Sequence, residues 1–371
     1  TLHTMQERVT MQLRIPGPTP CPPEALAASG KQMINHRGDE FAVLLNGVTD
    51  ELKHVYQTKN DLFILTASGT GGLEAAVVNT VSSGDRVLSA SCGVFGNRWA
   101  DIAATYGADV QRLQFPWGQP VEPDALGKAL DADPSIKVVL LTQNETSTGV
   151  ANDIGTLARI VRSYDKLLLV DAISGLGCMD LRTDAWGCDV VVSSSQKGYM
   201  VPPGLTMVSV SERAWKVRER AKSPSFYWDF KRARQALETG QTPWTPAVSV
   251  VFALEVTLKM MRAEGLPAIF ERHRQVGAAA REGAKALGLK LFARESHASN
   301  TVTAVDPSEG YDASTITRLL RDEYGIVLAG GQSTLKGKIF RIGHLGWVTV
   351  GDIEEINKAL AAVLPRARRG G

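Results

Sequence analysis

The sequence predicts an α/β protein, with a large domain built on a mostly parallel central sheet and a small C-terminal α+β domain. Short apolar runs alternate with amphipathic segments of helical length, which is typical of a sheet covered by helices on both faces. The runs at 138–141 and 167–170 are apolar at every position, as expected of strands buried on both faces. After residue 288 the pattern returns to strands and helices, which indicates the second domain.

The first 23 residues are predicted to form an extended arm, because five prolines occupy the nine positions 15–23 and exclude a helix or a central strand there. Helices are predicted at 40–59, 70–82, 94–107, 123–132 and 153–164, and strands at 62–65, 86–89, 110–115, 137–142, 166–171, 189–193 and 205–210. The last two strands are joined by a loop too short for a helical crossover, so at least one strand could run antiparallel.

A long helix is predicted after Pro246 and another at 268–288, with Gly265-Leu-Pro267 interrupting them. We place a domain boundary there, which gives a large domain at 24–264 and a small domain at 265–371. Within the small domain, strands are predicted at 289–293, 301–305, 326–329 and 338–343, and helices at 313–324 and 351–364.

Charge and cysteine content narrow the class of function. The chain has 41 basic and 39 acidic residues, so no overall field would attract it to nucleic acid or to an anionic membrane. No apolar run approaches eighteen residues, so no membrane span is predicted. The four cysteines lack C-x-x-C spacing, which argues against a structural zinc site and a disulfide framework. We therefore expect a cytoplasmic protein with reduced thiols and no metal.

One lysine stands in an unusual place. Lys197 follows the apolar run at 189–193 and lies among serines and a glutamine, on a loop closed by Gly198, Pro202, Pro203 and Gly204. An amine held just past a buried strand can have its pKa lowered by desolvation, which makes it a nucleophile able to form a Schiff base. The plainer alternative is a loop lysine that points into water.

Three other features follow predicted strands. Ser68, Gly69 and Thr70 begin a helix, where free N–H groups and the helix dipole favour an anion, although a helix cap without a ligand would have the same sequence. Asp171 ends the strand at 166–171 and is predicted to be paired, catalytic or a helix cap. Phe95 begins another helix, as a core residue or as a cover for a flat ligand.

Arg341 lies on a late, otherwise apolar strand and suits bidentate contact with a carboxylate, although it could equally be a surface arginine. An anion site, an acid, an aromatic ring and a reactive lysine at one end of a sheet meet the needs of a single cofactor. Pyridoxal 5'-phosphate requires these groups for its phosphate, ring nitrogen, ring face and aldehyde.

The chain resembles the class V aminotransferases of the fold-type I pyridoxal-phosphate family, most closely the alanine–glyoxylate and serine–glyoxylate (serine–pyruvate) aminotransferases. The resemblance runs nearly end to end. Its motifs are P-G-P-T-P from Pro16, H-R-G from His36, A-S-G-T-G-G-L-E from Ala67, G-V-F-G-N-R from Gly93, N-E-T-S-T-G-V from Asn144, V-D-A-I-S-G-L-G from Val170, S-S-S-Q-K-G from Ser193, T-P-W-T-P from Thr242 and F-R-I-G from Phe340.

The resemblance implies a role for each site residue. Lys197 would carry the cofactor as a Schiff base, Asp171 would pair with the pyridine nitrogen, and Phe95 would stack on the ring. The phosphate would be bound by Ser68, Gly69, Thr70 and Gln196, with Thr245 reaching it from a partner subunit. Thr146 would lie near the phenolic oxygen, and the substrate would be bound by Arg341 and Gly17.

The implied reaction is ping-pong transfer of an amino group from alanine or serine to glyoxylate or pyruvate. Animal relatives have tryptophan at the position of Phe95 and tyrosine where Thr242 aligns, so the part played by Thr242 is left open. Alternatives are a transaminase that uses aspartate, ureidoglycine or an aminophosphonate, a cysteine desulfurase-like lyase, and a non-catalytic protein with this fold. Because the family's sites are completed by both chains, a homodimer is expected.

Overall fold

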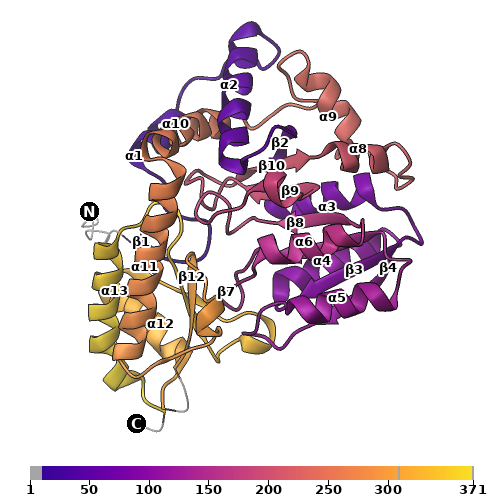
Figure 1. The fold of residues 1–371 in the computed structure, drawn as a ribbon. Coiled ribbons are helices and arrows are strands. Elements are labelled where there is room, and N and C mark those ends of the chain that lie inside the picture. Colours follow the sequence, from indigo (N-terminus) through magenta and orange to yellow (C-terminus); the bar gives the residue numbers. More distant parts are fainter. Residues whose placement is uncertain (1–10, 308–309, 370–371) are drawn as a thin grey trace.

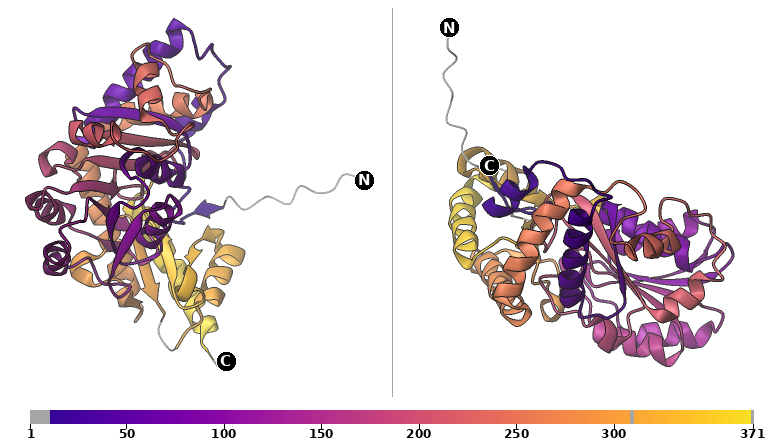
Figure 2. Two further views of the ribbon diagram at one scale, coloured as in Figure 1. Left: turned by 90° about the vertical axis from the view of Figure 1, so that its right-hand side faces the viewer. Right: turned by 90° about the horizontal axis from the view of Figure 1, so that it is seen from above.

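The computed structural model describes residues 11–307 and 310–369, so the first ten residues of the predicted arm lie outside the described part. Two regions lie side by side in Figure 1. The larger region surrounds a wide sheet, and the smaller one is formed by the chain after about residue 265, drawn in orange and yellow. Figure 2 shows the same separation from the side and from above.

Seven strands form the large sheet, in the order β2-β10-β9-β8-β5-β3-β4. They are β2 (Asp61–Ala67), β3 (Arg86–Ser91), β4 (Asp109–Gln114), β5 (Val138–Thr142), β8 (Leu167–Asp171), β9 (Val190–Ser194) and β10 (Gly204–Val210). β10 is antiparallel to both of its neighbours, and the other neighbouring pairs are parallel. The predicted mostly parallel sheet is confirmed, and the antiparallel strand occurs at the short loop where one was expected.

Successive residues of the central strands enter cores on opposite faces of the sheet. Val139 and Leu141 of β5 join one core, while Val138 and Leu140 join the other. This explains why the strand sequences are apolar throughout. One face is covered by α2 (Asp39–Tyr56), α5 (Pro123–Ala132), α6 (Ile154–Ser163) and α10 (Val248–Glu264), and the other by α3 (Gly69–Thr80), α4 (Val94–Thr105), α8 (Glu212–Arg218) and α9 (Phe230–Leu237).

A second, four-stranded sheet lies in the C-terminal region, in the order β11-β12-β15-β14, with every neighbouring pair antiparallel. Its strands are β11 (Lys290–Leu291), β12 (Val302–Asp306), β14 (Ala329–Gly330) and β15 (Phe340–Gly343). α11 (Leu266–Ala286), α12 (Ala313–Tyr324) and α13 (Val350–Val363) share a core with it. α10 and α11 meet at Gly265. Placing the domain boundary at that residue stays a prediction.

Two sequence predictions were wrong in detail. The predicted strand at 326–329 is two strands, because β13 (Ile326–Val327) pairs in parallel with β1 (Gln12–Leu13) of the arm, while β14 joins the small sheet. Pro23, assigned to the non-helical arm, is instead the first residue of α1 (Pro23–Ser29). Proline is tolerated there because the first N–H group of a helix needs no acceptor within the helix.

Several short elements were not predicted. They are α7 (Thr183–Trp186), β6 (Asn144–Glu145), β7 (Val150–Ala151) and the 3₁₀ turns η1 (Glu295–His297), η2 (Ser333–Leu335) and η3 (Leu364–Ala367), besides α1, β1, α8 and α9. β6 and β7 form an antiparallel hairpin. This hairpin follows β5 and becomes important at the site described below.

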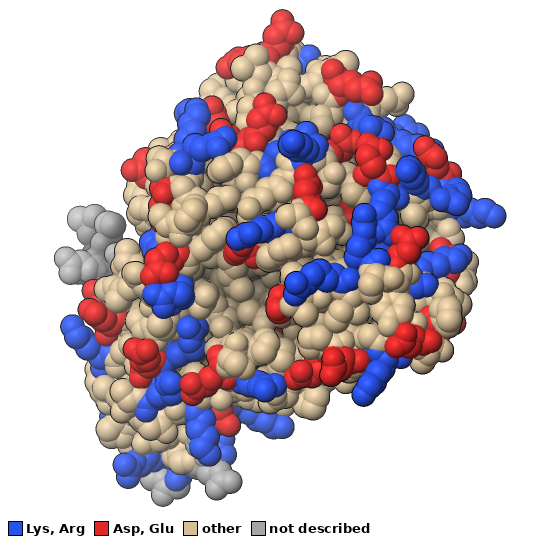
Figure 3. All heavy atoms as spheres, in the orientation of Figure 1, with Lys and Arg blue, Asp and Glu red and all other residues tan. Residues whose placement is uncertain are grey.

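The surface matches the balanced composition. On the face drawn in Figure 3, acidic side chains are interspersed among the basic ones over most of the area. Across the described ranges, no helix is both long enough and apolar enough to span a bilayer. In the same ranges, no three His, Cys, Asp or Glu side chains are grouped so that they could hold a metal ion.

Candidate active site

Lys197 lies three residues beyond the end of β9, in a loop beneath the N-terminal arm. Its Nζ donates a hydrogen bond to the backbone carbonyl of Pro16 at 2.5 Å. Burial lowers the pKa of Lys197 to about 8. A substantial fraction of the amine is therefore uncharged near neutral to mildly alkaline pH, which suits a nucleophile or a base.

Gly17 of the arm packs directly against this lysine. It has a φ of +134°, which only glycine adopts readily, and a Cβ added there would lie 2.8 Å from Cδ and Cε of Lys197. The arm can therefore approach the lysine this closely only with glycine at position 17. The structure thus brings the predicted Gly17 and Lys197 together.

Asp171 ends β8 and is 3% exposed. Its Oδ1 accepts a hydrogen bond from the backbone N–H of Ile173 at 2.9 Å. Burial raises the pKa of Asp171 to about 7, against the opposing effects of the nearby Lys197 and Arg98 cations. A buried carboxyl group in this condition would be ionised more fully by a cationic partner in the cavity.

The start of α3 forms the third part of the site. Ser68 precedes the helix without capping it, and the N–H groups of Gly69 and Thr70 have no acceptor among the described residues. A Cβ added at Gly69 would lie 2.6 Å from Cδ1 of Ile173, so a side chain there would crowd the cavity wall. Free N–H groups at a helix N-terminus favour an anion.

These residues line one cavity. Eight predicted residues contribute to it, namely Ser68, Gly69, Thr70, Phe95, Thr146, Asp171, Gln196 and Lys197. Five residues without an assigned role complete the lining, namely Leu73, Arg98, Asn144, Ile173 and Ser174. The carboxyl ends of β5, β8 and β9 bring the residues together, as expected for a ligand site in an open α/β sheet.

The predicted Thr146 and two polar residues without an assigned role, Asn144 and Ser174, form a hydrogen-bond network on one wall of the cavity. Asn144 Nδ2 donates to Ser174 Oγ at 2.8 Å, and Ser174 Oγ lies 2.7 Å from Thr146 Oγ1. Asn144 Oδ1 is buried without a partner among the described residues. Because Asn144 and Ser174 both closely follow strands that were predicted, their position in the chain was an available signal.

Phe95 and Arg98 lie one turn apart at the start of α4. The Arg98 guanidinium carbon is 4.8 Å from the centroid of the Phe95 ring, within the range of a cation–π contact. Both side chains line the cavity. Arg98 belongs to the G-V-F-G-N-R motif, but sequence reasoning assigned it no role.

Arg341 of β15 lies in the C-terminal region, is 6% exposed and is bonded to Thr146 of the cavity wall without lining the cavity itself. Its Nε donates to the Gly330 carbonyl at 3.0 Å, and its Nη1 donates to the Thr146 carbonyl at 3.1 Å and to Gln332 Oε1 at 3.2 Å. Nη2 has no acceptor among the described residues. Burial lowers the pKa of Arg341 to about 10, so the side chain is still a cation at pH 7.

Three predicted site residues, Gly17, Arg341 and Thr245, are not part of the lining; Gly17 contacts Lys197 and Arg341 contacts Thr146, whereas Thr245 contacts neither. Thr245 is exposed. The neighbouring Thr242 is buried, and its Oγ1 donates to the Trp244 carbonyl at 2.7 Å. The contribution of Thr245 to a site on another subunit stays a prediction, and that of Thr242 stays open.

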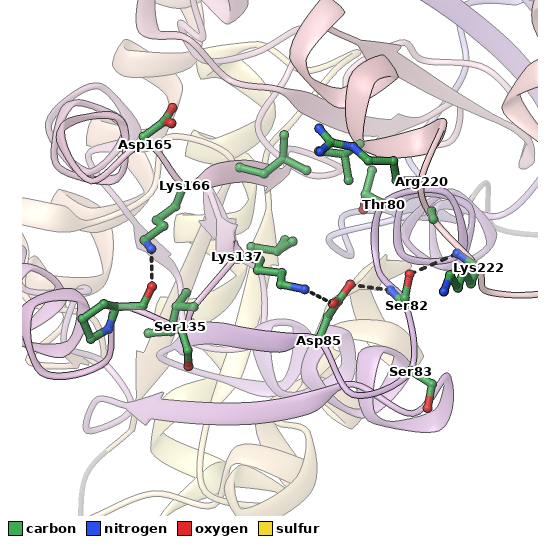
Figure 4. Close-up of a pocket in the computed structure, with 16 residues that line it drawn as sticks. Thr80, Ser82, Ser83, Asp85, Ser135, Lys137, Asp165, Lys166, Arg220 and Lys222 are labelled. Atoms are coloured by element: carbon green, nitrogen blue, oxygen red, sulfur yellow. Dashed lines mark hydrogen bonds and ion pairs between the residues drawn. The ribbon is translucent and has the colours of Figure 1, made fainter.

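A larger hollow, of about 820 Å³, lies elsewhere and is shown in Figure 4. It includes Lys137 and Lys166, which immediately precede β5 and β8, so it lies at the opposite end of these strands from Asp171. Lys137 pairs with Asp85 at 2.5 Å, and Lys166 donates to the Pro134 carbonyl at 2.7 Å. The hollow is therefore separate from the reactive lysine and acid.

The chain is similar in sequence and in fold to known aminotransferases. The family model described as aminotransferase class-V matches residues 24–349. A Synechococcus sp. protein named soluble hydrogenase, small subunit, is 46% identical over 97% of this chain and 94% of its own length. The L-aspartate–glyoxylate aminotransferase of Paracoccus denitrificans is 38% identical over 90% of this chain and 86% of its own.

Among solved structures, the alanine–glyoxylate aminotransferase of Nostoc sp. superposes with a TM-score of 0.92 at 30% identity, covering 98% of this chain and 97% of that one. The matched family model covers both the lysine loop and Arg341. The chain therefore belongs to the class-V aminotransferases and has their fold.

Proposed function

We propose that this aminotransferase uses pyridoxal 5'-phosphate to transfer an amino group from alanine or serine to glyoxylate or pyruvate. One observation carries the proposal. Lys197, with its lowered pKa, shares a cavity with the buried Asp171 and with the free N–H groups at the start of α3. No single one of these features is specific, but an amine, an acid and an anion site in one cavity match the three polar ends of this cofactor.

The lining residues fit the cofactor in chemical type. Gly69 and Thr70 N–H groups and the Ser68 and Gln196 side chains would hold its phosphate, and Phe95 would cover its ring. Asp171 would pair with the ring nitrogen, which relieves the cost of a buried carboxylate without a cationic partner. When bound, the cofactor supplies an aldehyde that reacts with amines and a ring that withdraws electrons from the substrate's α-carbon.

Lys197 would then remove and return the proton at the substrate's α-carbon. Its amine has a pKa of about 8 in the chain itself, so it can accept and donate a proton near physiological pH. The Pro16 carbonyl orients Nζ through their hydrogen bond, and Gly17 lets the arm shield the amine from water. Arg341, through Nη2, would bind the substrate's α-carboxylate and fix the direction of the α-carbon.

The proposal includes a homodimer with shared sites. Trp244, which immediately precedes Thr245, stacks with Phe226 and Tyr227 in an aromatic cluster, and the latter two side chains are 65% and 42% exposed. The Phe226 and Trp244 rings are stacked, with centroids 4.9 Å apart. A second copy covering this cluster would remove apolar surface from water and bring Thr245 toward a neighbouring cavity. A light-scattering mass of one chain in active protein would contradict this.

The first test is a visible absorbance spectrum of the purified protein supplied with pyridoxal phosphate. Alanine, serine and aspartate are then added one at a time. We expect one donor to bleach the cofactor band and glyoxylate or pyruvate to restore it, which would identify the substrate pair. Borohydride reduction should fix the cofactor on Lys197 and leave none on a Lys197→Ala variant. Failure to take up the cofactor at all would refute the proposal.

Aspartate is the second candidate donor. The Paracoccus denitrificans relative carries aspartate in its name, and Arg98, which lines the cavity, is a second cation besides Arg341. A side-chain carboxylate needs such a cation when it is buried. If aspartate bleaches the band far better than alanine or serine, it replaces them as the proposed donor. An Arg98→Gln variant should then lose aspartate turnover more than alanine turnover.

A lyase role and a non-catalytic role have less support. A desulfurase-like lyase needs an accessible thiol, but burial raises the pKa of Cys92, Cys178 and Cys188 to about 12, and Cys21 is half-buried with a raised pKa. A non-catalytic subunit role is compatible with the name of the Synechococcus relative, but Lys197 and Asp171 line one cavity and Arg341 is bonded to the carbonyl of Thr146 in its wall, which supports catalysis instead. The four thiols are free, which supports the proposed cytoplasmic location.

A further inference from the structure

The start of α4, which carries Phe95, is capped by another part of the chain. Gly93 precedes the helix and has no side chain to accept its first N–H groups. The Val94 N–H donates to Ser147 Oγ at 3.0 Å, and the Phe95 and Gly96 N–H groups both donate to Glu145 Oε2 at 3.1 Å. The cap therefore comes from the β6–β7 hairpin, about fifty residues away in sequence.

Glu145 is fully buried. Besides the two helix N–H groups, its Oε1 accepts from the backbone N–H of Ser147 at 3.1 Å and from Ser147 Oγ at 2.5 Å. Burial raises the pKa of Glu145, while these donors oppose the rise. The ionised carboxylate satisfies all four donors, and it lies at the positive end of the α4 dipole.

The fit between Glu145 and the helix is close. A Cβ added at Gly93 would lie 2.5 Å from Cγ and Cδ of Glu145 and from Ser147 Oγ. A serine or aspartate at position 93, which could cap the helix locally, would clash with Glu145 and Ser147, the side chains that cap it instead. The arrangement fixes the hairpin and the first turn of α4 as one unit.

This unit touches the cavity at two points. Phe95, whose own N–H is held by Glu145, lines the cavity, and so does Thr146, the residue after Glu145. The Thr146 carbonyl accepts from Arg341 Nη1 at 3.1 Å. Phe95, the predicted ring cover, and Arg341, the predicted carboxylate-binding residue, are therefore both hydrogen-bonded to the β6–β7 hairpin.

We propose that Glu145 is a positioning residue that fixes Phe95 over the cofactor ring by capping α4. The inference rests on the proposed function, because it takes Phe95 as the ring cover for pyridoxal phosphate. Glu145 does not line the cavity, so it would act on the cofactor only through Phe95. Its loss should loosen the first turn of α4 and weaken cofactor binding, since the ring would meet a less ordered face.

The test compares Glu145→Gln with wild type in the full-length, cofactor-free protein. The amide keeps one acceptor oxygen but turns an NH₂ group toward N–H donors. We expect faster hydrogen–deuterium exchange in peptides covering 93–99, and an equilibrium affinity for pyridoxal phosphate lower by about tenfold, the loss that corresponds to one hydrogen bond to a charged acceptor. Asp189→Asn is the matched control.

Asp189 is also buried, 2% exposed, and its carboxylate accepts from the Leu168 N–H and from Ser211 Oγ, both at 2.9 Å. It lies at the opposite end of the sheet from the cavity. Asp189→Asn should lower stability but leave exchange at 93–99 and cofactor affinity as in wild type. If it weakens cofactor binding as much as Glu145→Gln does, a general loss of stability explains both, and the proposal is wrong.

Unchanged exchange and affinity in Glu145→Gln would also overturn the proposal. If that variant does not fold, Ser147→Ala decides the matter, because it removes the acceptor of the Val94 N–H and one donor to Glu145. It should give a smaller shift in the same two measurements, and no shift would refute the capping role. Wild-type protein that binds no pyridoxal phosphate would instead refute the proposed function, so the two failures are distinguishable.

Discussion

Replacing Arg341 by lysine should weaken substrate binding much more than it slows turnover. Arg341 is held by Gly330, Thr146 and Gln332 through Nε and Nη1, which leaves Nη2 to bind a carboxylate. Lysine keeps the positive charge but has a single nitrogen, which cannot replace three internal hydrogen bonds and bind the substrate at the same time. The substrate would bind without a fixed direction.

The structure sets the size of the effect. A hydrogen bond to a charged group contributes about 1.5–3 kcal/mol. Because about 1.4 kcal/mol corresponds to a factor of ten, losing the carboxylate contact should raise KM for the amino donor by roughly 10- to 150-fold. Each internal bond of the charged guanidinium that the lysine fails to replace should also lower the free energy of unfolding by about 1.5–3 kcal/mol.

The assay is steady-state kinetics with the donor identified by absorbance titration, together with urea unfolding. Arg281→Lys is the control. Arg281 is also partly buried in the C-terminal region, where it donates to the Ser299 carbonyl at 2.7 Å and to Asn300 Oδ1 at 3.2 Å, but unlike Arg341 it is not bonded to a residue that lines the cavity. A KM unchanged in Arg341→Lys, or raised equally in Arg281→Lys, would refute the assignment of Arg341.

Three further predictions concern the rest of the site and its support. Asp171→Asn should nearly abolish turnover while circular dichroism shows an intact fold, and full activity would exclude its role. In cofactor-free wild-type protein, the free energy of unfolding should rise as pH increases from about 8 to 10.5, because folding then no longer requires burial of a protonated Lys197. Lys197→Met should show a weaker dependence on pH in this range. Equal pH dependence in the two proteins would contradict this. Gly72→Ala should lower stability by about 1–3 kcal/mol, because the new Cβ would lie 2.7 Å from Val192 Cγ1, whereas Gly47→Ala, with nothing within 4 Å, should not destabilise in the same thermal melts.

The strands and most helices were predictable because their signals are local. Continuous apolar runs such as 167–170 can be buried only in a covered sheet, and the amphipathic segments between them can only cover it. Asp171 and Lys197 could be placed at one edge for the same reason, since the carboxyl ends of parallel strands meet there. The lowered pKa of Lys197 then follows from its position after a buried strand.

The missed features depend on contacts between distant segments. The run 326–329 has the composition of one strand, and only pairing with Gln12–Leu13 of the arm divides it. The sequence around Arg98 does not predict a role for it apart from its motif, because its role depends on its contact with the Phe95 ring and on its position in the cavity wall. Thr245 is exposed in the single chain, so a second copy is needed to test its role.

Glu145 shows most clearly why part of the site is hidden in the sequence. In the run Asn144-Glu-Thr-Ser-Thr it has the features of a solvated loop residue, yet it is fully buried beneath the first turn of α4. Its neighbours on both sides face the cavity, and the Thr146 carbonyl holds Arg341. A change at this hairpin should therefore alter cofactor and substrate binding together. Cofactor and substrate binding would be coupled in this way without movement between the two regions of the chain, because the β6–β7 hairpin is bonded both to the helix turn that carries Phe95 and to Arg341.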